Sequence, residues 1–230
     1  MANNEVGTVQ PIAGLARVAR THGARFHTDA VQAFGKLPVD VGALGADALS
    51  LSAHKVGGPK GQGILYLRTG TPFVAYLAGG GQERGLRSGT QDVMGIAGSV
   101  AAFAQAAAHA DAEGSRLALL RDAAYARLSA VPGVTPTLAS ATGPGFLPNI
   151  VNVCVHGWES QSLVLRLDMR GFSVSGGSAC SSNSLSPSHV LSACGIDGKR
   201  AQGSLRLSFG SDTTIEDVEA VAQALEDIVS

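Results

Sequence analysis

Three short apolar runs in the first third of the chain, each bounded by turn-forming residues, most constrain the fold. They cover residues 25–28, 47–52 and 63–68. Runs of this length predict β-strands, and the helical pattern of residues 12–22 before them predicts an alternation of helix and strand. Such an alternation is typical of a mostly parallel α/β sheet, in which ligands bind beyond the carboxyl ends of the strands. The first run ends at Asp29 and the second leads into Lys55.

Helical and strand patterns continue to the end of the chain. We expect helices over residues 90–130, 159–169, 187–194 and 214–228, and strands over residues 150–155, 172–175 and 204–209. The helical pattern of residues 90–130 is interrupted near residues 111–114, and the last helix begins with the capping sequence Thr214 to Asp217. We therefore predict two domains, a partial large domain of residues 1–110 and a small α+β domain of residues 111–230.

Composition and charge argue against several classes of partner. Hydrophobic residues make up 45% of the 230 positions, which allows a sizeable core. The net charge is −1 and the 17 basic residues are scattered, so we expect no nucleic-acid partner. The most apolar stretch, Ser99 to Ala110, is too short to span a bilayer, so we expect no membrane partner. Three cysteines without CxxC spacing, in a chain without a visible signal peptide, predict reduced thiols, no metal site and a cytoplasmic location.

Lysine is scarce in this chain. Its positions are Lys36, Lys55, Lys60 and Lys199. Lys55 follows a predicted strand end and precedes a glycine-rich turn. A lysine in a fixed and partly desolvated place can form a Schiff base with a cofactor aldehyde, as in enzymes that use pyridoxal 5'-phosphate (PLP). Position alone is equally consistent with a surface lysine in a loop, and the surrounding motifs favour the Schiff base.

Five short motifs carry a family resemblance. They are His27-Thr28-Asp29-Ala30-Val31-Gln32, Ser52-Ala53-His54-Lys55, the segment from Gly79 to Thr90, Ser175-Gly176-Gly177-Ser178-Ala179-Cys180 and Ser204-Leu205-Arg206-Leu207-Ser208-Phe209-Gly210. In order and spacing they resemble the NifS/IscS-type cysteine desulfurases, which are class-V aminotransferase-like PLP enzymes of fold type I. The resemblance covers the whole chain and implies an α/β fold, with the C-terminal part of the large PLP-binding domain followed by a small domain that carries the catalytic cysteine loop.

The resemblance implies a PLP site in the large domain. Lys55 would form the Schiff base, and Asp29 would pair with the pyridine nitrogen and keep it protonated. Gln32 would bind the phenolic oxygen of the cofactor. Asn4 would lie close to that oxygen and to the substrate carboxylate. From residue chemistry alone, Asp29 could instead be a turn or helix N-cap residue.

Three further residues are implied phosphate ligands. Ser52 and His54 suit this role because a hydroxyl and an imidazole can donate to phosphate oxygens from a strand end. Thr90 resembles the family's phosphate ligand supplied by the partner subunit, which implies a homodimer. Thr90 could also be a helix N-cap, and the two roles are compatible.

The resemblance assigns the sulfur chemistry to Cys180. This thiolate would take the sulfur of the substrate cysteine, leaving an enzyme persulfide and releasing alanine, and small polar residues surround it. Arg206 lies in a strand, where a buried guanidinium needs a partner; the substrate carboxylate is one candidate and a structural ion pair is the other. We expect Cys154, in an apolar strand, to be a buried packing residue and Cys194 to be structural.

Family members carry a large N-terminal portion ahead of residues 2–5, with a phosphate-binding loop and a histidine that stacks on the pyridine ring. The chain therefore resembles an N-terminally truncated member, and we expect it to bind PLP weakly and to turn over little cysteine. The implied function is the supply of sulfur from L-cysteine to a sulfur-acceptor or iron–sulfur scaffold protein, for cluster assembly or for sulfuration of a thio-cofactor or tRNA. The alternatives are a selenocysteine lyase, another class-V aminotransferase-like enzyme, and an inactive fragment.

Overall fold

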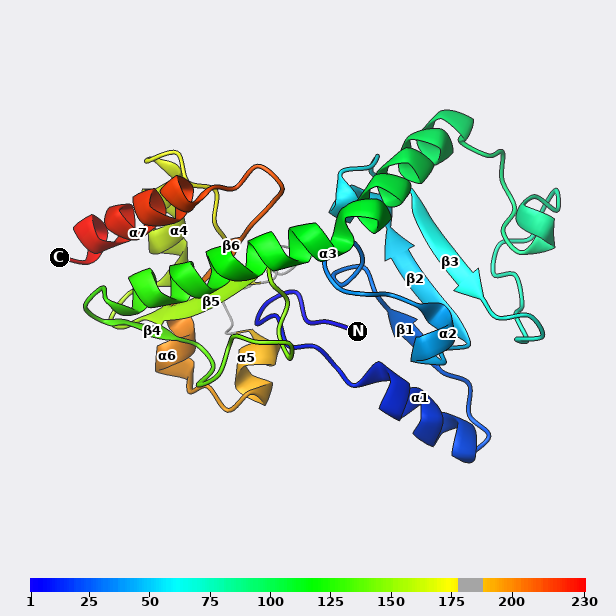
Figure 1. Cartoon of the computed structure of the whole chain (residues 1–230), viewed down its shortest axis with the longest axis horizontal. Helices are drawn as coiled ribbons and strands as arrows, with labels where there is room; N and C mark the ends of the chain where they lie inside the picture. The colour runs from blue at the N-terminus through cyan, green and yellow to red at the C-terminus, as the bar shows by residue number, and fades with distance from the viewer. Residues whose placement is uncertain (178–187) are drawn as a thin grey trace. The chain divides into compact units, whose positions relative to one another are not determined.

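The structure is a computed structural model that describes residues 1–177 and 188–230 (Figure 1). The chain forms two compact units, one of Met1 with Pro11–Ala110 and the other of Ala2–Gln10 with Asp111–Ser230. Residues 2–10, which we placed in the first domain from the sequence, therefore belong to the second unit. The reason is backbone pairing, because Val9 N donates to Gly145 O at 2.8 Å and Thr8 forms a β-bridge with Phe146.

A three-stranded sheet with the order β1-β2-β3 lies at the centre of the first unit. Its strands are β1 (His27–Asp29), β2 (Ala48–Ser52) and β3 (Gly63–Leu67). β1 and β2 are parallel, whereas β3 is antiparallel to β2. The described sheet is thus mixed, where the sequence predicted a mostly parallel one. Only the 3₁₀ helix η1 (Ala53–Val56) and a glycine-rich turn join β2 to β3, and a parallel pair needs a longer crossover.

Short helices complete the first unit. They are α1 (Ile12–Thr21), α2 (Val41–Leu44) and η2 (Glu83–Gly85), together with the first half of α3 (Val93–Ser129). α1 is followed by Gly23, whose φ of 68° ends the helix as predicted. The sequence did not predict α2, which is only one turn long and is capped by the Asp40 carboxylate at Ala43 N (2.9 Å). The core of this unit consists of Ala30, Leu49, Leu51, Ala53 and Phe103.

α3 is continuous over 37 residues, so the predicted break near residues 111–114 is wrong. A helical glycine such as Gly114 costs only about 1 kcal/mol relative to alanine, and the neighbouring alanines are strong helix formers. Among the described helices, α3 is the one long and apolar enough to cross a membrane by length and composition, with a mean hydropathy of 1.3. Core helices of soluble proteins reach the same length and hydropathy but are mostly buried, whereas 11% of this 18-residue window of α3 is buried. α3 contributes Phe103 to the core of the first unit and Leu117 and Leu128 to that of the second.

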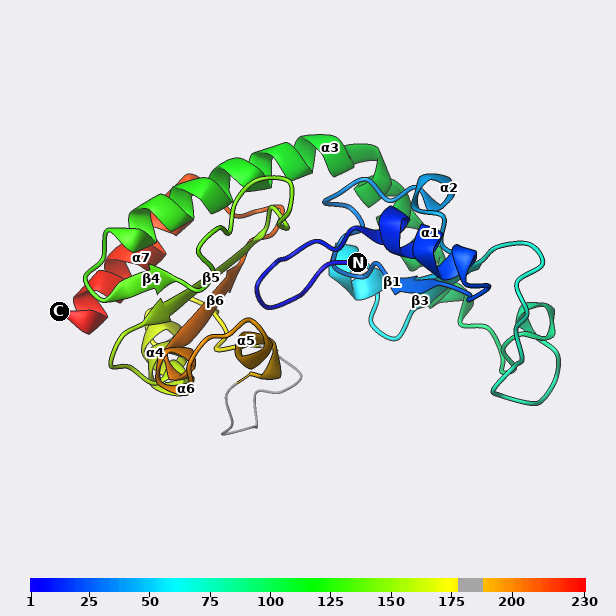
Figure 2. The same cartoon turned by 90° about the horizontal axis from the view of Figure 1, so that it is seen from below.

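The second unit is built on the antiparallel sheet β4-β5-β6. Its strands are β4 (Val134–Pro136), β5 (Ile150–Val155) and β6 (Ser204–Ser208), and its helices are the second half of α3, α4 (Ser160–Asp168), α5 (His189–Ala193), α6 (Gly198–Gln202) and α7 (Ile215–Val229). α3, α4 and α7 pack on one face of the sheet, and α5 and α6 lie on the other (Figures 1 and 2). Thr214 and Asp217 form the predicted capping box of α7.

The predicted strand over residues 172–175 is reduced to one bridge between Ser175 and Arg206. Ser175 N donates to Arg206 O at 3.0 Å, and Arg206 N donates to Ser175 O at 2.6 Å. Gly176 and Gly177 follow at once, and glycine is a poor strand former, so the pairing does not extend beyond this bridge.

Candidate active site

The polar residues of the first unit gather where β1 and β2 end. The two strands are parallel and Asp29 lies beside Ser50 in their register, so their carboxyl ends are neighbours. The Asp29 side chain is exposed, and its Oδ1 accepts a hydrogen bond from Val31 N at 2.8 Å. Asp29 is thus the last residue of β1, and its accessible carboxylate also caps the turn that follows. In the described part of the chain no ion pair within 4.0 Å includes it.

Lys55 lies in η1, the 3₁₀ helix that begins directly after β2. Its side chain is exposed, and within the described residues it makes no hydrogen bond or ion pair. Gly57 ends η1 with a φ of 82°. A Cβ at Gly58 would lie 3.0 Å from Ala53 Cβ and 3.1 Å from Ala102 Cβ, so glycine allows this turn to pack closely. The backbone of Lys55 is therefore fixed at the strand end by a closely packed turn, and its amine is accessible.

The other predicted cofactor ligands of the first unit lie close to these two in sequence. Gln32 follows Asp29 in the same turn and is half-buried, Ser52 is the half-buried last residue of β2, and His54 is exposed in η1 beside Lys55. The set contains a carboxylate, an amide, a hydroxyl, an imidazole and an amine. This is the chemistry that a pyridine nitrogen, a phenolic oxygen, a phosphate and an aldehyde require, so the residues fit PLP.

Thr90 is exposed and lies outside any helix. The N-cap interaction of α3 comes instead from Asp92, whose Oδ1 accepts from Gly95 N at 3.0 Å. The N-cap interpretation of Thr90 is therefore wrong. Asp92 was the better choice in the sequence, because an N-cap aspartate accepts from the backbone three residues further on.

Arg206 is the central site residue of the second unit. It is half-buried on β6, and one guanidinium nitrogen donates to Asn4 O at 3.0 Å. Arg206 Nε is buried and has no hydrogen-bond partner among the described residues, and no ion pair within 4.0 Å includes Arg206 there. The structural ion pair is thus not found. Burial lowers the pKa of the guanidinium, and the charge of Glu5 opposes this shift.

Two residues of this site were missed from the sequence. Asn152 lies opposite Arg206 in the β5-β6 register and donates from Nδ2 to Glu5 O at 3.0 Å. Glu5 has only 2% of its surface exposed, and its Oε2 accepts from Ser188 Oγ at 2.5 Å. The sequence contained a cue to each residue. Asn152 is a polar amide within an apolar strand, and Glu5 follows two asparagines in a polar run.

The structure thus describes the predicted site residues in two groups. Asp29, Gln32, Ser52, His54 and Lys55 belong to the first unit, with Thr90 apart from them, and Asn4 and Arg206 belong to the second. Cys180 lies outside the described residues.

The other two cysteines differ from each other. Cys154 is 1% exposed on β5, which confirms its interpretation as a packing residue. Cys194 is exposed at the end of α5, so the structural role that we expected is wrong. α5 has five residues and buries only Leu191, and its C-cap residue, Cys194, lies in solvent.

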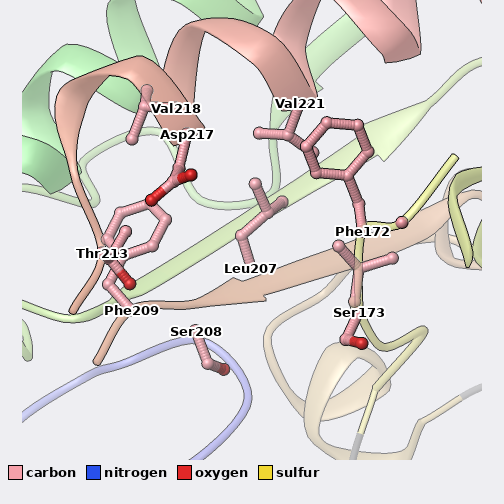
Figure 3. A pocket seen from close by; sticks show the side chains of 11 residues that line it. Phe172, Ser173, Leu207, Ser208, Phe209, Thr213, Asp217, Val218 and Val221 are labelled. Carbon is pink, nitrogen blue, oxygen red and sulfur yellow. The ribbon is translucent and has the colours of Figure 1, made fainter. Parts of the chain in front are cut away.

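A pocket on the second unit lies away from these residues (Figure 3). It is lined by Phe172, Leu207, Phe209, Thr213, Asp217 and Val221, among others. Leu207 and Arg206 are adjacent on β6 and point to opposite faces of the sheet. The pocket is therefore not part of the candidate site, and its carboxylate, Asp217, is already bound to Thr214 in the capping box.

Comparison with known proteins confirms the family resemblance. Residues 1–221 match the model of the class-V aminotransferase family, whose members use PLP. The chain is 44% identical to a cysteine desulfurase IscS of Dictyoglomus turgidum over 99% of this chain and 57% of that protein. It is 41% identical to the cysteine desulfurase NifS of Azotobacter vinelandii over 100% of this chain and 56% of that protein.

Solved structures agree with the sequence relatives. A NifS-like protein matches with a TM-score of 0.88 and 36% identity, over 99% of this chain and 59% of that one. A NifS-like protein from Rickettsia africae matches with a TM-score of 0.89 and 32% identity, over 99% and 60%. The chain spans about 57% of the length of the curated relatives it matches. From the family model, the relatives and the fold together, the chain belongs to the class-V aminotransferases.

Proposed function

We propose that this chain carries the substrate-binding and sulfur-accepting part of a cysteine desulfurase, which uses PLP to remove sulfur from L-cysteine. The observation that carries the proposal is the buried Nε of Arg206, which lies beside Asn4 and has no hydrogen-bond partner among the described residues. A buried N–H without an acceptor is costly, and a carboxylate is the natural bidentate partner of a guanidinium. An amino-acid substrate brings such a group. The relatives named cysteine desulfurase, at 41–44% identity, support the choice of cysteine.

The residues of the first unit would hold the cofactor. When bound, PLP supplies an electron-withdrawing ring that stabilises negative charge on the substrate carbon. The Asp29 carboxylate would keep a proton on the pyridine nitrogen. Gln32 would bind the phenolic oxygen, Ser52 and His54 would bind the phosphate, and the Lys55 amine would bond to the aldehyde carbon.

Cys180 would accept the sulfur. As its thiolate forms a sulfur–sulfur bond with the substrate, the carbon–sulfur bond of cysteine breaks and its electron pair stays with the carbon. That carbon takes up a proton and becomes the methyl group of alanine. The balance is one cysteine and one enzyme thiol giving one alanine and one enzyme persulfide, with no external oxidant.

The proposal includes a homodimer, a cytoplasmic location and a sulfur-acceptor or iron–sulfur scaffold protein as partner. Thr90 is exposed, as a phosphate ligand for a second subunit must be. Large apolar side chains are also exposed in the first unit, with Val74 at 89%, Tyr76 at 96% and Met94 at 86%. Exposed apolar side chains of this size favour burial against another polypeptide. The free thiols of Cys154 and Cys194 agree with a reducing compartment.

Two measurements test the function. After addition of PLP, we expect a weak visible absorbance band that Lys55→Ala abolishes and Lys60→Ala, a nearby control, leaves unchanged. With PLP and L-cysteine, we expect alanine in amounts stoichiometric with the chain, and none from Cys180→Ala. No alanine from the unmodified chain would favour the inactive fragment. Alanine from Cys180→Ala equal to that from the unmodified chain would favour another class-V enzyme, and faster turnover of selenocysteine than of cysteine would favour a lyase.

A further inference from the structure

Glu5 is a buried carboxylate to which the proposed reaction assigns no role. Its side chain is 2% exposed, and in the described part of the chain no ion pair within 4.0 Å includes it. Its Oε2 accepts a hydrogen bond from Ser188 Oγ, and Ser188 also caps α5 by accepting from Val190 N at 3.1 Å. A buried charge with one neutral hydrogen bond is costly, so another favourable interaction must offset part of that cost.

The backbone around Glu5 is hydrogen-bonded to the face of the β5-β6 sheet that carries Asn152 and Arg206. Arg206 donates to Asn4 O and Asn152 donates to Glu5 O, at 3.0 Å in each case. Asn3 Oδ1 accepts from the backbone N–H groups of Glu5 and Val6 at 2.8 and 2.9 Å and holds the turn from the other side. The backbone of Asn4 and Glu5 is thus fixed beside Arg206 and Asn152, and the hydrogen bond from Ser188 Oγ holds the Glu5 carboxylate.

Glu5 and Arg206 are oppositely charged groups in a poorly solvated region. The charge of Glu5 favours the protonated form of Arg206 and acts against the lowering of its pKa by burial. The two side chains do not form an ion pair within 4.0 Å, so Glu5 acts on Arg206 through space, and Nε has no hydrogen-bond partner among the described residues. At low effective dielectric such a through-space attraction remains substantial.

We propose that Glu5 is a positioning residue, whose buried carboxylate is the counter-charge that keeps the Arg206 guanidinium beside Asn4 with Nε free for a ligand. Without the Glu5 charge, hydration stabilises the guanidinium more than its buried surroundings do, and the side chain turns toward solvent. The last step, that the free Nε receives a substrate carboxylate, rests on the proposed function. The positioning itself does not.

The test follows the Arg206 Nε–H group by ¹⁵N NMR, in the full chain without PLP or cysteine. The signal that disappears in Arg206→Lys is the one from Arg206 Nε–H. The rate at which this proton exchanges with solvent reports how long the guanidinium stays buried. Glu5→Gln keeps an acceptor for Ser188 and removes the charge, so we expect exchange to accelerate about tenfold. Ser188→Ala keeps the charge and removes the hydrogen bond, so exchange should stay within about twofold. Glu219→Gln, at an exposed ion pair with Arg127, is the matched control and should change nothing.

Glu5→Asp separates charge from shape, because it keeps the carboxylate and shortens the side chain. We expect it to retain most of the protection that Glu5→Gln loses, whereas a purely structural role would make both variants lose it alike. Unchanged exchange in Glu5→Gln would overturn the proposal. If Glu5→Gln does not fold, full loss of protection in a folded Glu5→Asp would overturn it. None of these outcomes depends on catalysis, so a failure of the desulfurase proposal leaves this test intact.

Discussion

Arg206 and Asn152 lie directly opposite each other on β6 and β5, and their side chains donate to the adjacent carbonyls of Asn4 and Glu5. One amide and one guanidinium thus attach the segment of residues 2–10 to the sheet. The Asn152 Oδ1 accepts in turn from Thr137 Oγ1 at 2.5 Å and Ser204 Oγ at 3.4 Å. Asn152 is therefore the centre of a buried polar network that links three strands or their ends to the start of the chain.

Asn152→Ala should destabilise the protein strongly. The substitution leaves a buried carbonyl and two buried hydroxyls without this partner, and we expect the free energy of unfolding to fall by about 2–4 kcal/mol. Urea denaturation followed by circular dichroism measures the change. Gln223→Ala removes an exposed amide on α7 and should change stability by less than about 0.5 kcal/mol. Equal effects of the two substitutions would contradict the network.

Gly63→Ala should weaken the β2-β3 pair, whose strands precede and follow Lys55. A Cβ at this position would lie 2.6 Å from Leu51 O, and a backbone oxygen cannot move away without breaking strand pairing. We expect a loss of about 1–3 kcal/mol, in the range for overpacking. Gly14→Ala is the matched control, since nothing lies within 4 Å of its Cβ in α1 and the change should stabilise by up to about 1 kcal/mol. A gain in stability at both positions would contradict the close approach at Gly63.

The two described cysteines should differ in thiol reactivity. In a Cys180→Ala background, one thiol, that of Cys194, should react quickly with Ellman's reagent in the native protein, because its side chain is exposed. Cys154 is 1% exposed and should react only after the protein unfolds. Cys194→Ser in the same background should remove the fast phase. Persistence of the fast phase would contradict the assignment.

Tyr125 should make stability decline at alkaline pH. Burial raises the pKa of its hydroxyl, and the hydrogen bond that Asn152 N donates to the hydroxyl oxygen acts in the opposite direction. Because the folded-state pKa lies above the unfolded value of about 10, this contribution is complete below pH 10 and is lost as the pH rises through the folded-state pKa. Tyr125→Phe should reduce the decline in unfolding free energy between pH 9 and pH 11. A decline of the same size in the variant would assign it to other groups.

Sequence patterns predicted elements whose signals are local. α1 between Pro11 and Gly23, the fully buried strand β5, and the Thr214–Asp217 capping box are of this kind. The break in α3 was predicted wrongly because the small cost of Gly114 is spread over a long alanine-rich helix. The direction of β3 depends on how much chain separates it from β2, which strand propensity does not report.

The residues of the candidate site also divide into those with a local sequence signal and those without one. Asp29 ends β1 and Lys55 follows β2, and both could be found from the sequence because strand ends are local features. The role of Glu5 could not be found in this way. Its environment depends on Asn152, 147 residues further along the chain, and on Ser188, 183 residues away. Burial of a carboxylate by such distant partners is a tertiary property, which neither pattern nor motif reports.

The attachment of residues 2–10 to the β5-β6 sheet has a consequence for biosynthesis. The hydrogen bond between Arg206 and Asn4 closes a loop of 202 residues. During translation residues 2–10 leave the ribosome long before β6 is made, so their partner strand is not yet present. Closing so long a loop is entropically costly and slow compared with local pairing. We expect the second unit to acquire its native packing only after synthesis of β6, so that chaperone dependence is greatest for nascent chains that stop before Ser204.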